Sequence, residues 1–114
     1  MRSLFLVSIL GACTNPEEPA ECQCVDYKVT SSIGAFDQLT IKWHEDGHDW
    51  TETKVYEPTT EARVEYAHPY AGPSSFELIA ATGMGLVGVG SAELNYVHVK
   101  ESYYVASGIV ALMP

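Results

Sequence analysis

The chain has 114 residues, which allows one domain of modest size. Its 15 acidic residues outnumber its six basic residues and give a formal net charge of −9. An acidic surface repels nucleic-acid phosphates, and the sequence has no basic cluster to offset that repulsion. Composition and charge therefore exclude nucleic acid from the expected partners.

The first residues have the three parts of an export signal. Arg2 supplies a positive charge, Leu4 to Leu10 form a short apolar run, and small residues precede Cys13. The run is far shorter than the roughly 20 residues of a membrane-spanning helix. Leu10-Gly11-Ala12-Cys13 resembles the bacterial lipobox, in which cleavage precedes the cysteine and its thiol is acylated. We expect residues 1–12 to be a lipoprotein signal peptide and Cys13 to be the lipidation site.

The alternative for this segment is a buried N-terminal strand with an incidental cysteine. Cleavage before Cys13 would remove Arg2 and make the formal charge one unit more negative. Acylation would hold the domain on a membrane, because each buried acyl CH₂ contributes about 0.8 kcal/mol. We therefore expect a lipid-anchored protein of the cell envelope, at the outer membrane or the cell surface.

Residues 13–24 are expected to be a disordered tether between the lipid and the folded domain. From Thr14 onward the segment contains two prolines, three glutamates and no large aliphatic residue. Such a composition cannot bury a core. The acidic pair Glu17-Glu18 is similar to surface-export signals in lipoproteins of Bacteroidota, and a merely solvated linker is the alternative.

An extracytoplasmic address permits disulfides, and Cys22 and Cys24 are the candidates. In an extended strand, residues i and i+2 point the same way, with Cα atoms near the upper limit for a bridge. A Cys22–Cys24 bond would therefore need a tight turn or would be strained. A soft metal site is an alternative, but two thiolates are only half of a structural zinc site and no His follows at ligand spacing. A local or intermolecular disulfide is the preferred interpretation.

From Val25 onward, apolar and polar residues alternate with a period of two, which is typical of half-buried strands. No window has a helical stripe. The alternating runs are residues 39–44, 50–56, 64–66, 76–80 and 94–99. The turn signals between them are Asp46-Gly47, Glu57-Pro58, Gly72-Pro73 and Gly83-Met84-Gly85. The sequence predicts an all-β fold, an antiparallel β-sandwich of about seven strands.

The order of motifs in this predicted sandwich resembles a PKD-type immunoglobulin-like domain. The family hallmark is His-x-Tyr-x-x-Pro-Gly-x-Tyr/Phe-x-Val, and the matching residues here are His68, Tyr70, Pro73 and Phe76. Ser74 stands in place of the turn glycine. The resemblance implies that the Tyr and the Phe anchor two strands in the core and that the Pro turn joins them.

Two further segments carry the resemblance. The run from Trp43 to Gly47 resembles the family's Trp-x-Phe-Gly-Asp-Gly turn with one residue missing, and Ala92 to Val99 resembles its closing strand. The match spans about residues 25–100 and implies a non-catalytic surface module that contacts protein or carbohydrate. Residues 25–114 are therefore expected to be one PKD-like domain, in which residues 103–114 add a C-terminal strand. A sticky edge for a partner is the alternative for that last segment.

No catalytic residue and no cofactor are expected. A general base at His68 lacks a partner, because no Ser or Cys has the nucleophile-elbow pattern, and the resemblance implies a structural role for this His. His98 is interpreted as a residue of a sheet. The glycine-rich run from Gly83 to Gly90 lacks the Lys of a P-loop and is interpreted as a hairpin or a bulged strand.

The densest polar stretch lies between two tryptophans, and it contains His44, Glu45, Asp46, His48 and Asp49. Such residues can ligate zinc or calcium, but the Asp-Gly pair is sufficiently explained as a turn, and no metal is expected. Exposed aromatic side chains stack on sugars or fill protein pockets. Trp43 is expected in the core. Trp50, flanked by His48 and Asp49, is the candidate binding surface.

The sequence thus predicts a membrane-anchored, non-catalytic binding module for a protein or polysaccharide ligand. The alternative is a structural or assembly subunit of a cell-envelope complex, joined to its partner through the C-terminal strand. A metal-binding or enzymatic domain is the least favoured hypothesis.

Overall fold

The computed structural model describes residues 22–68, 72–100 and 103–114. This part of the chain forms strands and turns, and none of it is a helix that is long and apolar enough to cross a membrane. The strands in chain order are β2 (Cys22–Thr30), β3 (Phe36–Glu45), β4 (His48–Thr59), β5 (Glu61–His68), β6 (Ser75–Thr82), β7 (Gly85–Glu93), β8 (His98–Lys100) and β9 (Tyr103–Ala111).

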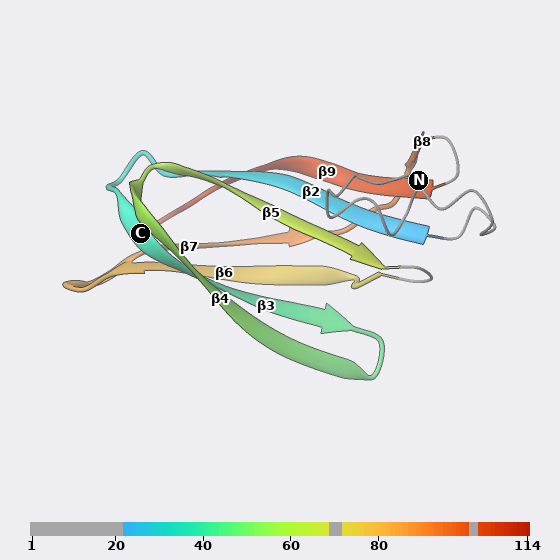
Figure 1. Cartoon of the computed structure of the whole chain (residues 1–114), viewed down its shortest axis with the longest axis horizontal. Helices are drawn as coiled ribbons and strands as arrows, with labels where there is room; N and C mark the ends of the chain where they lie inside the picture. Colours follow the sequence, from blue (N-terminus) through green and yellow to red (C-terminus); the bar gives the residue numbers. More distant parts are fainter. Residues whose placement is uncertain (1–21, 69–71, 101–102) are drawn as a thin grey trace, which may run out of the picture.

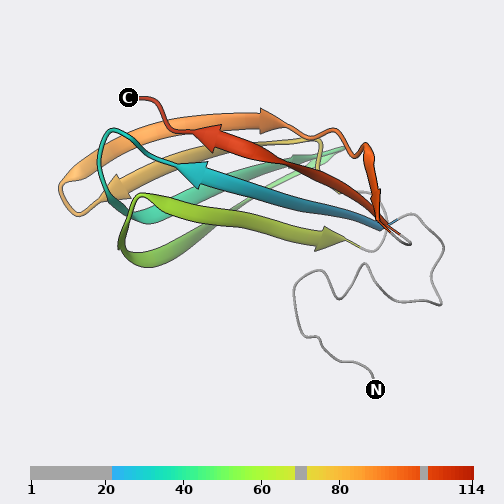
Figure 2. The same ribbon diagram turned by 90° about the horizontal axis from the view of Figure 1, so that it is seen from above.

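The strands form two sheets that pack face to face as a sandwich (Figures 1 and 2). One sheet has the strand order β5-β2-β9-β8 and the other has the order β4-β3-β6-β7. Neighbouring strands are antiparallel except β2 and β9, which are parallel. The predicted all-β sandwich is confirmed, with seven long strands and the three-residue β8.

The first described strand has different neighbours from the first strand of a constant-type immunoglobulin domain. In that domain the first strand pairs with the second, whereas β2 lies between β5 and β9. The next strand, β3, instead forms the middle of the other sheet, between its hairpin partner β4 and β6. The architecture is that of an immunoglobulin-like sandwich with a strand order of its own.

Alternation along β3 and β6 builds the centre of the core. Alternate residues of the two strands are buried apolar side chains, while the residues between them, Ile79 included, face outward. The register places buried residues opposite one another, where cross-strand contacts stabilise a sheet. These pairs are Trp43–Phe76, Ile41–Leu78 and Leu39–Ala80.

The C-terminal segment forms a strand inside its sheet. β9 pairs with β2 along its whole length, and its first residues pair with β8 on the other side. Ala106, Val110 and Leu112 belong to the buried core. Beyond β9, Met113 exchanges two backbone hydrogen bonds with Val89 of β7, at 2.8 and 2.9 Å. The segment therefore joins the two sheets.

The glycines of β7 let the two sheets approach each other. Gly88 and Gly90 lie opposite the buried Ala80 and Leu78 and so share the core face of the sheet. A Cβ atom built on Gly90 would lie 2.6 Å from Cγ1 of Val110 in β9. The glycine-rich run from Gly83 to Gly90, predicted as a hairpin or a bulged strand, forms the β6–β7 turn and most of β7. The pairing of β7 with β6 shifts register between Ala80 and Ala81 of β6.

The folded domain begins earlier than its composition indicated. A tether was expected through residue 24, yet β2 starts at Cys22, and Cys24 is fully buried. Gln23 and Cys24 pair with both β5 and β9. A strand in the middle of a sheet is held by its backbone hydrogen bonds, which do not require aliphatic side chains. Residues 13–21 lie outside the described residues.

Candidate binding surface

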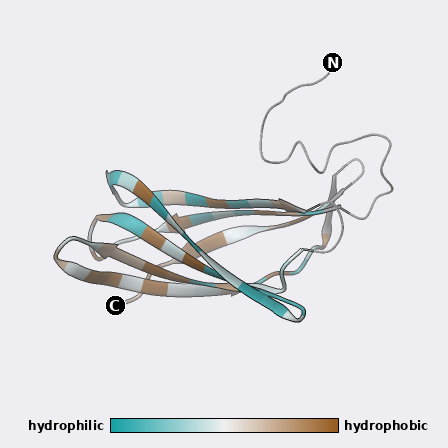
Figure 3. Ribbon diagram, turned by 60° about the horizontal axis from the view of Figure 1, so that its bottom comes forward, coloured by the Kyte–Doolittle hydropathy of each residue, from teal (hydrophilic) through white to brown (hydrophobic). Residues whose placement is uncertain are grey.

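The candidate residues lie on the hairpin that joins β3 and β4. Asp46 and Gly47 form its two-residue turn, and Gly47 has a φ of 75°, a conformation that glycine favours. The predicted turn is therefore confirmed. Its tip is strongly hydrophilic, in contrast to the strands behind it (Figure 3). The register across the hairpin pairs Trp43 with Trp50, His44 with Asp49 and Glu45 with His48.

Trp50 belongs to a cluster of aromatic rings that we call the aromatic end, formed by Trp43, His48, Trp50 and Tyr66. The indole of Trp50 stacks on Trp43, with ring centroids 5.9 Å apart and planes at 22°. The His48 ring stacks on Trp50 at 5.5 Å and 23°, and Tyr66 of β5 contacts the same indole at 5.5 Å. Trp43 is buried, Trp50 is half-buried and His48 is exposed. The stack therefore runs from the core to solvent.

Trp43 fixes the inner end of this stack. Its ring packs edge-on against Phe76 at 5.4 Å and lies 5.3 Å from Tyr66. Its indole Nε1 donates a hydrogen bond of 2.7 Å to Oε2 of Glu52. The prediction that Trp43 is a core residue is confirmed.

Asp49 points to the opposite face of β4. Its Oδ1 lies 3.3 Å from Nδ1 of His44, and Nε2 of the same imidazole lies 3.2 Å from Oε2 of Glu77. Adjacent residues of a strand face opposite sides of the sheet. The structure therefore brings His48 and Trp50 together and places Asp49 on the other face of the strand.

The polar residues of the hairpin do not converge on one point. His44 lies between two carboxylates on the outer face, whereas His48 stacks on Trp50. Among the residues that the structure describes, no three His, Cys, Asp or Glu side chains are placed to hold a metal ion.

Two tyrosines complete this end of the sandwich, and sequence reasoning did not single them out. Burial, followed by the charges of Glu45 and Glu52, raises the pKa of Tyr66. Burial raises the pKa of Tyr96 much further, and its hydroxyl donates a hydrogen bond of 2.6 Å to the carbonyl oxygen of Pro73. Tyr66 lies two residues after Val64, so the period of two places both side chains on the same face of the strand. No sequence signal indicates that Tyr66 contacts Trp50 of the other sheet.

We expect alkaline pH to destabilise the fold. Burial raises the pKa of four tyrosines above 10.0, namely Tyr27, Tyr56, Tyr66 and Tyr96. The unfolded chain loses these protons near pH 10 while the folded chain keeps them, so stability is fully present below about pH 10 and falls as the pH rises further. Urea unfolding between about pH 8 and pH 11 should show this fall. Tyr96→Phe should make the fall shallower, and an unchanged slope in that variant would contradict the assignment.

Cys24 takes part in a disulfide. It alternates with the core residue Val25 and therefore faces the outer side of its sheet, beside Val105 of β9. The partner sulfur lies outside the described residues, as do Cys13 and the side chain of Cys22. The candidate Cys22–Cys24 pair therefore stays a prediction.

Other predicted features also lie outside the described residues: the signal peptide, Tyr70 and the side chains of His68 and His98. Of the PKD-like motif, Pro73 and Phe76 are described, and both are fully buried. No protein-family model matches the chain, and no curated protein or solved structure matches it either. The resemblance to PKD domains stays a prediction.

Proposed function

We propose that this chain is a non-catalytic binding module, held on a bacterial membrane by a lipid on Cys13, that contacts a protein partner through the aromatic end. The lipobox from Leu10 to Cys13 supports the anchor. The chain from Cys13 to the start of β2 at Cys22 has a maximum reach of about 30 Å at 3.3–3.6 Å per residue. Such a length would hold the domain close to the membrane surface.

The observation that carries the proposal is the ring stack from the buried Trp43 to the exposed His48. Rings that are already packed lose little side-chain entropy on binding, which favours affinity. Two rings already stack on Trp50, which leaves less of its faces free for a sugar. This geometry favours a protein partner over a carbohydrate.

The charges around the stack favour a partner with basic side chains. Residues 43–53 contain no Lys or Arg, and their acidic residues are Glu45, Asp46, Asp49 and Glu52. An acidic surface steers cationic partners toward itself. A Lys or Arg of the partner would therefore meet the carboxylates beside the ring stack.

Peptide and glycan arrays test this binding surface. We expect the full chain to bind peptides rich in Lys and Arg, with a signal that weakens as salt concentration rises. His48→Ala and Trp50→Ala should each reduce the signal by roughly tenfold or more, in the range of hot-spot residues. Thr51→Ala, on the opposite face of the same strand, is the matched control. Binding to glycans alone, or equal binding by all variants, would contradict the proposal.

The anchor makes a separate prediction about the cysteines. Acylation consumes the thiol of Cys13, so a lipidated chain must bond Cys24 to Cys22 or to another chain. The intact mass of the exported protein should match an acylated chain that begins at Cys13, and globomycin should block its processing. Non-reducing peptide mapping should show no Cys13–Cys24 bond. Such a bond, or an unlipidated chain that retains Met1, would contradict lipidation.

A further inference from the structure

The chain enters the sandwich beside the aromatic end. β2 begins at Cys22, and Val25, three residues later, pairs with Tyr66 of β5. The ring of Tyr66 lies 5.5 Å from the indole of Trp50. Because three residues of an extended strand span about 10 Å, the start of β2 lies close to the ring stack, at the same end of the sandwich (Figures 1 and 2).

A second set of contacts connects the start of β2 to the β3–β4 hairpin. The backbone N–H of Gly72 donates a hydrogen bond of 2.6 Å to Oε1 of Gln23 in β2. Two residues further along the chain, the N–H of Ser74 donates a hydrogen bond of 2.7 Å to the carbonyl oxygen of His44, near the end of β3. The start of β2 and the hairpin are therefore both fixed at this end of the sandwich.

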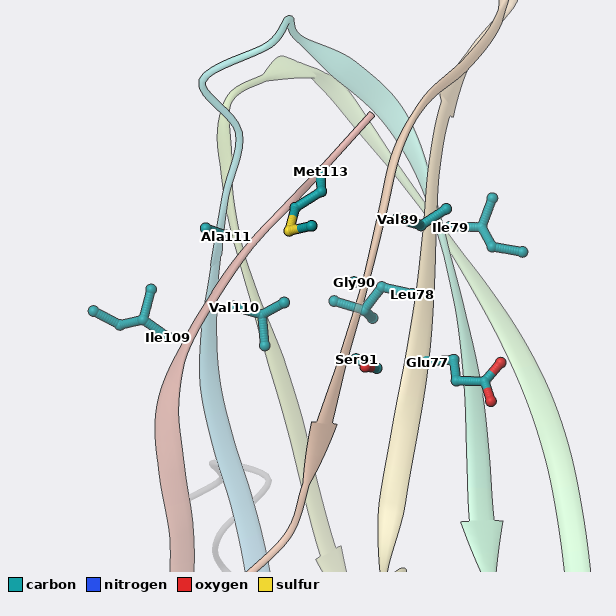
Figure 4. Close-up of a pocket in the computed structure, with 10 residues that line it drawn as sticks. All are labelled: Glu77, Leu78, Ile79, Val89, Gly90, Ser91, Ile109, Val110, Ala111 and Met113. Atoms are coloured by element: carbon teal, nitrogen blue, oxygen red, sulfur yellow. The ribbon is translucent and has the colours of Figure 1, made fainter.

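The opposite end of the sandwich has a different character. β9 ends there, and Met113 pairs with Val89 beside an open pocket of about 650 Å³ (Figure 4). The residues that line this pocket include Glu77 and Ile109 but no aromatic ring. The length of β2 separates the two ends by about 27 Å, at about 3.3 Å per residue. The ring stack and the acidic hairpin thus belong to the end where the chain enters.

We propose that the aromatic end lies toward the membrane that carries the lipid anchor, and that its partner is a segment rich in Lys and Arg in a protein at the surface of that same membrane. This inference rests on the proposed function, from which it takes the anchor at Cys13 and the binding surface. The chain from Cys13 to Cys22 reaches at most about 30 Å. The end that contains Cys22 therefore stays within that distance of the anchor in every orientation of the domain, whereas the far end can lie a whole strand length further away.

Charge favours a protein over the lipid itself as the partner. Residues 43–53 carry four carboxylates and no Lys or Arg. Such a surface repels anionic headgroups and attracts a basic protein segment. A partner in the same membrane also has a high effective concentration, on the order of mM for short flexible linkers. The position of the aromatic end and its charge therefore fit the same kind of partner.

Vesicles that carry the acylated chain test this placement. A peptide rich in Lys and Arg is coupled to a lipid through a short linker and placed either on the same vesicles or on separate ones. We expect binding on the same vesicles, and binding between separate vesicles that is weaker by roughly tenfold or more. Trp50→Ala should lose the binding on the same vesicles. Thr51→Ala, on the opposite face of β4, is the matched control and should retain it.

Tryptophan fluorescence measures the orientation independently. Both tryptophans of the chain, Trp43 and Trp50, belong to the aromatic end, so their emission should be transferred to dansyl-labelled headgroups. Met84→Trp adds a third tryptophan at the β6–β7 turn, where Met84 is 98% exposed, and should lower the transferred fraction. Thr51→Trp adds one beside Trp50 and should not lower it.

The outcomes distinguish this placement from the proposed function. If the free peptide does not bind the full chain in solution, the binding surface is wrong and both proposals fail. If the peptide binds in solution but the chain joins separate vesicles as readily as it binds on its own, or if Met84→Trp raises the transferred fraction, the aromatic end points away from the membrane and this inference alone is overturned. Binding of the unacylated Cys13→Ser chain to anionic vesicles without peptide, lost in Trp50→Ala, would assign the aromatic end to lipid and would also overturn it.

Discussion

A chain that ends at Ser102 is expected not to fold. Its deletion removes β9, which pairs with β2 from Cys22↔Tyr103 to Thr30↔Ala111. It also removes Ala106, Val110 and Leu112 from the core. Burying one large aliphatic side chain contributes about 1.5–3 kcal/mol, and a small domain has only about 5–15 kcal/mol of total stability. The loss of core contacts together with a central ladder is comparable to that whole margin.

Circular dichroism and tryptophan fluorescence should show this loss directly. The truncated chain should lack a cooperative unfolding transition and should emit at the wavelength of solvent-exposed tryptophan. A chain that ends at Leu112 is the matched control, since it retains β9 and loses Met113 with its two hydrogen bonds to Val89. The control should fold with reduced stability. A truncated chain that still unfolds cooperatively would instead make the C-terminal segment a detachable edge strand, as an assembly subunit joined through that segment requires.

The sequence predicted the strands best where alternation is uninterrupted. Leu39, Ile41 and Trp43 alternate with polar residues, and all three are buried in β3. In β7 the corresponding core positions are Gly88 and Gly90, so the apolar period disappears although the strand remains. The reason is steric, because the space beside Gly90 is occupied by Val110 of the other sheet. Apolar periodicity therefore does not identify a strand whose core positions are glycine because a facing side chain occupies the space.

The sequence indicates which residues form strands more readily than it indicates which strands lie side by side. Periodicity places β2 and β9 as strands but does not indicate that they run in parallel side by side, about 80 residues apart in sequence. For the candidate site, the prediction grouped Asp49 with Trp50, although alternation puts adjacent residues of one strand on opposite faces of the sheet. The contact of Trp50 with Tyr66 joins different sheets. It follows from sandwich packing, which local sequence does not specify.

Trp43→Ala is expected to cost about 3–5 kcal/mol of unfolding free energy, as for other buried tryptophans. The side chain is fully buried and contacts Trp50, Tyr66 and Phe76. Its removal leaves a cavity between the sheets and takes the indole donor from the Glu52 carboxylate. Urea unfolding monitored by circular dichroism measures the loss. Lys42→Ala, the exposed neighbour on the opposite face of β3, should change stability far less.

The same substitution separates stability from binding. Trp43 does not reach solvent, so a ligand at the aromatic end touches His48 and Trp50 but not Trp43 itself. Trp43→Phe retains an aromatic ring against Trp50 and should lose less stability than Trp43→Ala. Because the smaller ring supports the indole over a smaller area, binding of basic peptides should weaken while the chain stays folded. Unchanged binding in a folded Trp43→Phe chain would mean that the ring stack stabilises the hairpin and does not prepare a binding surface.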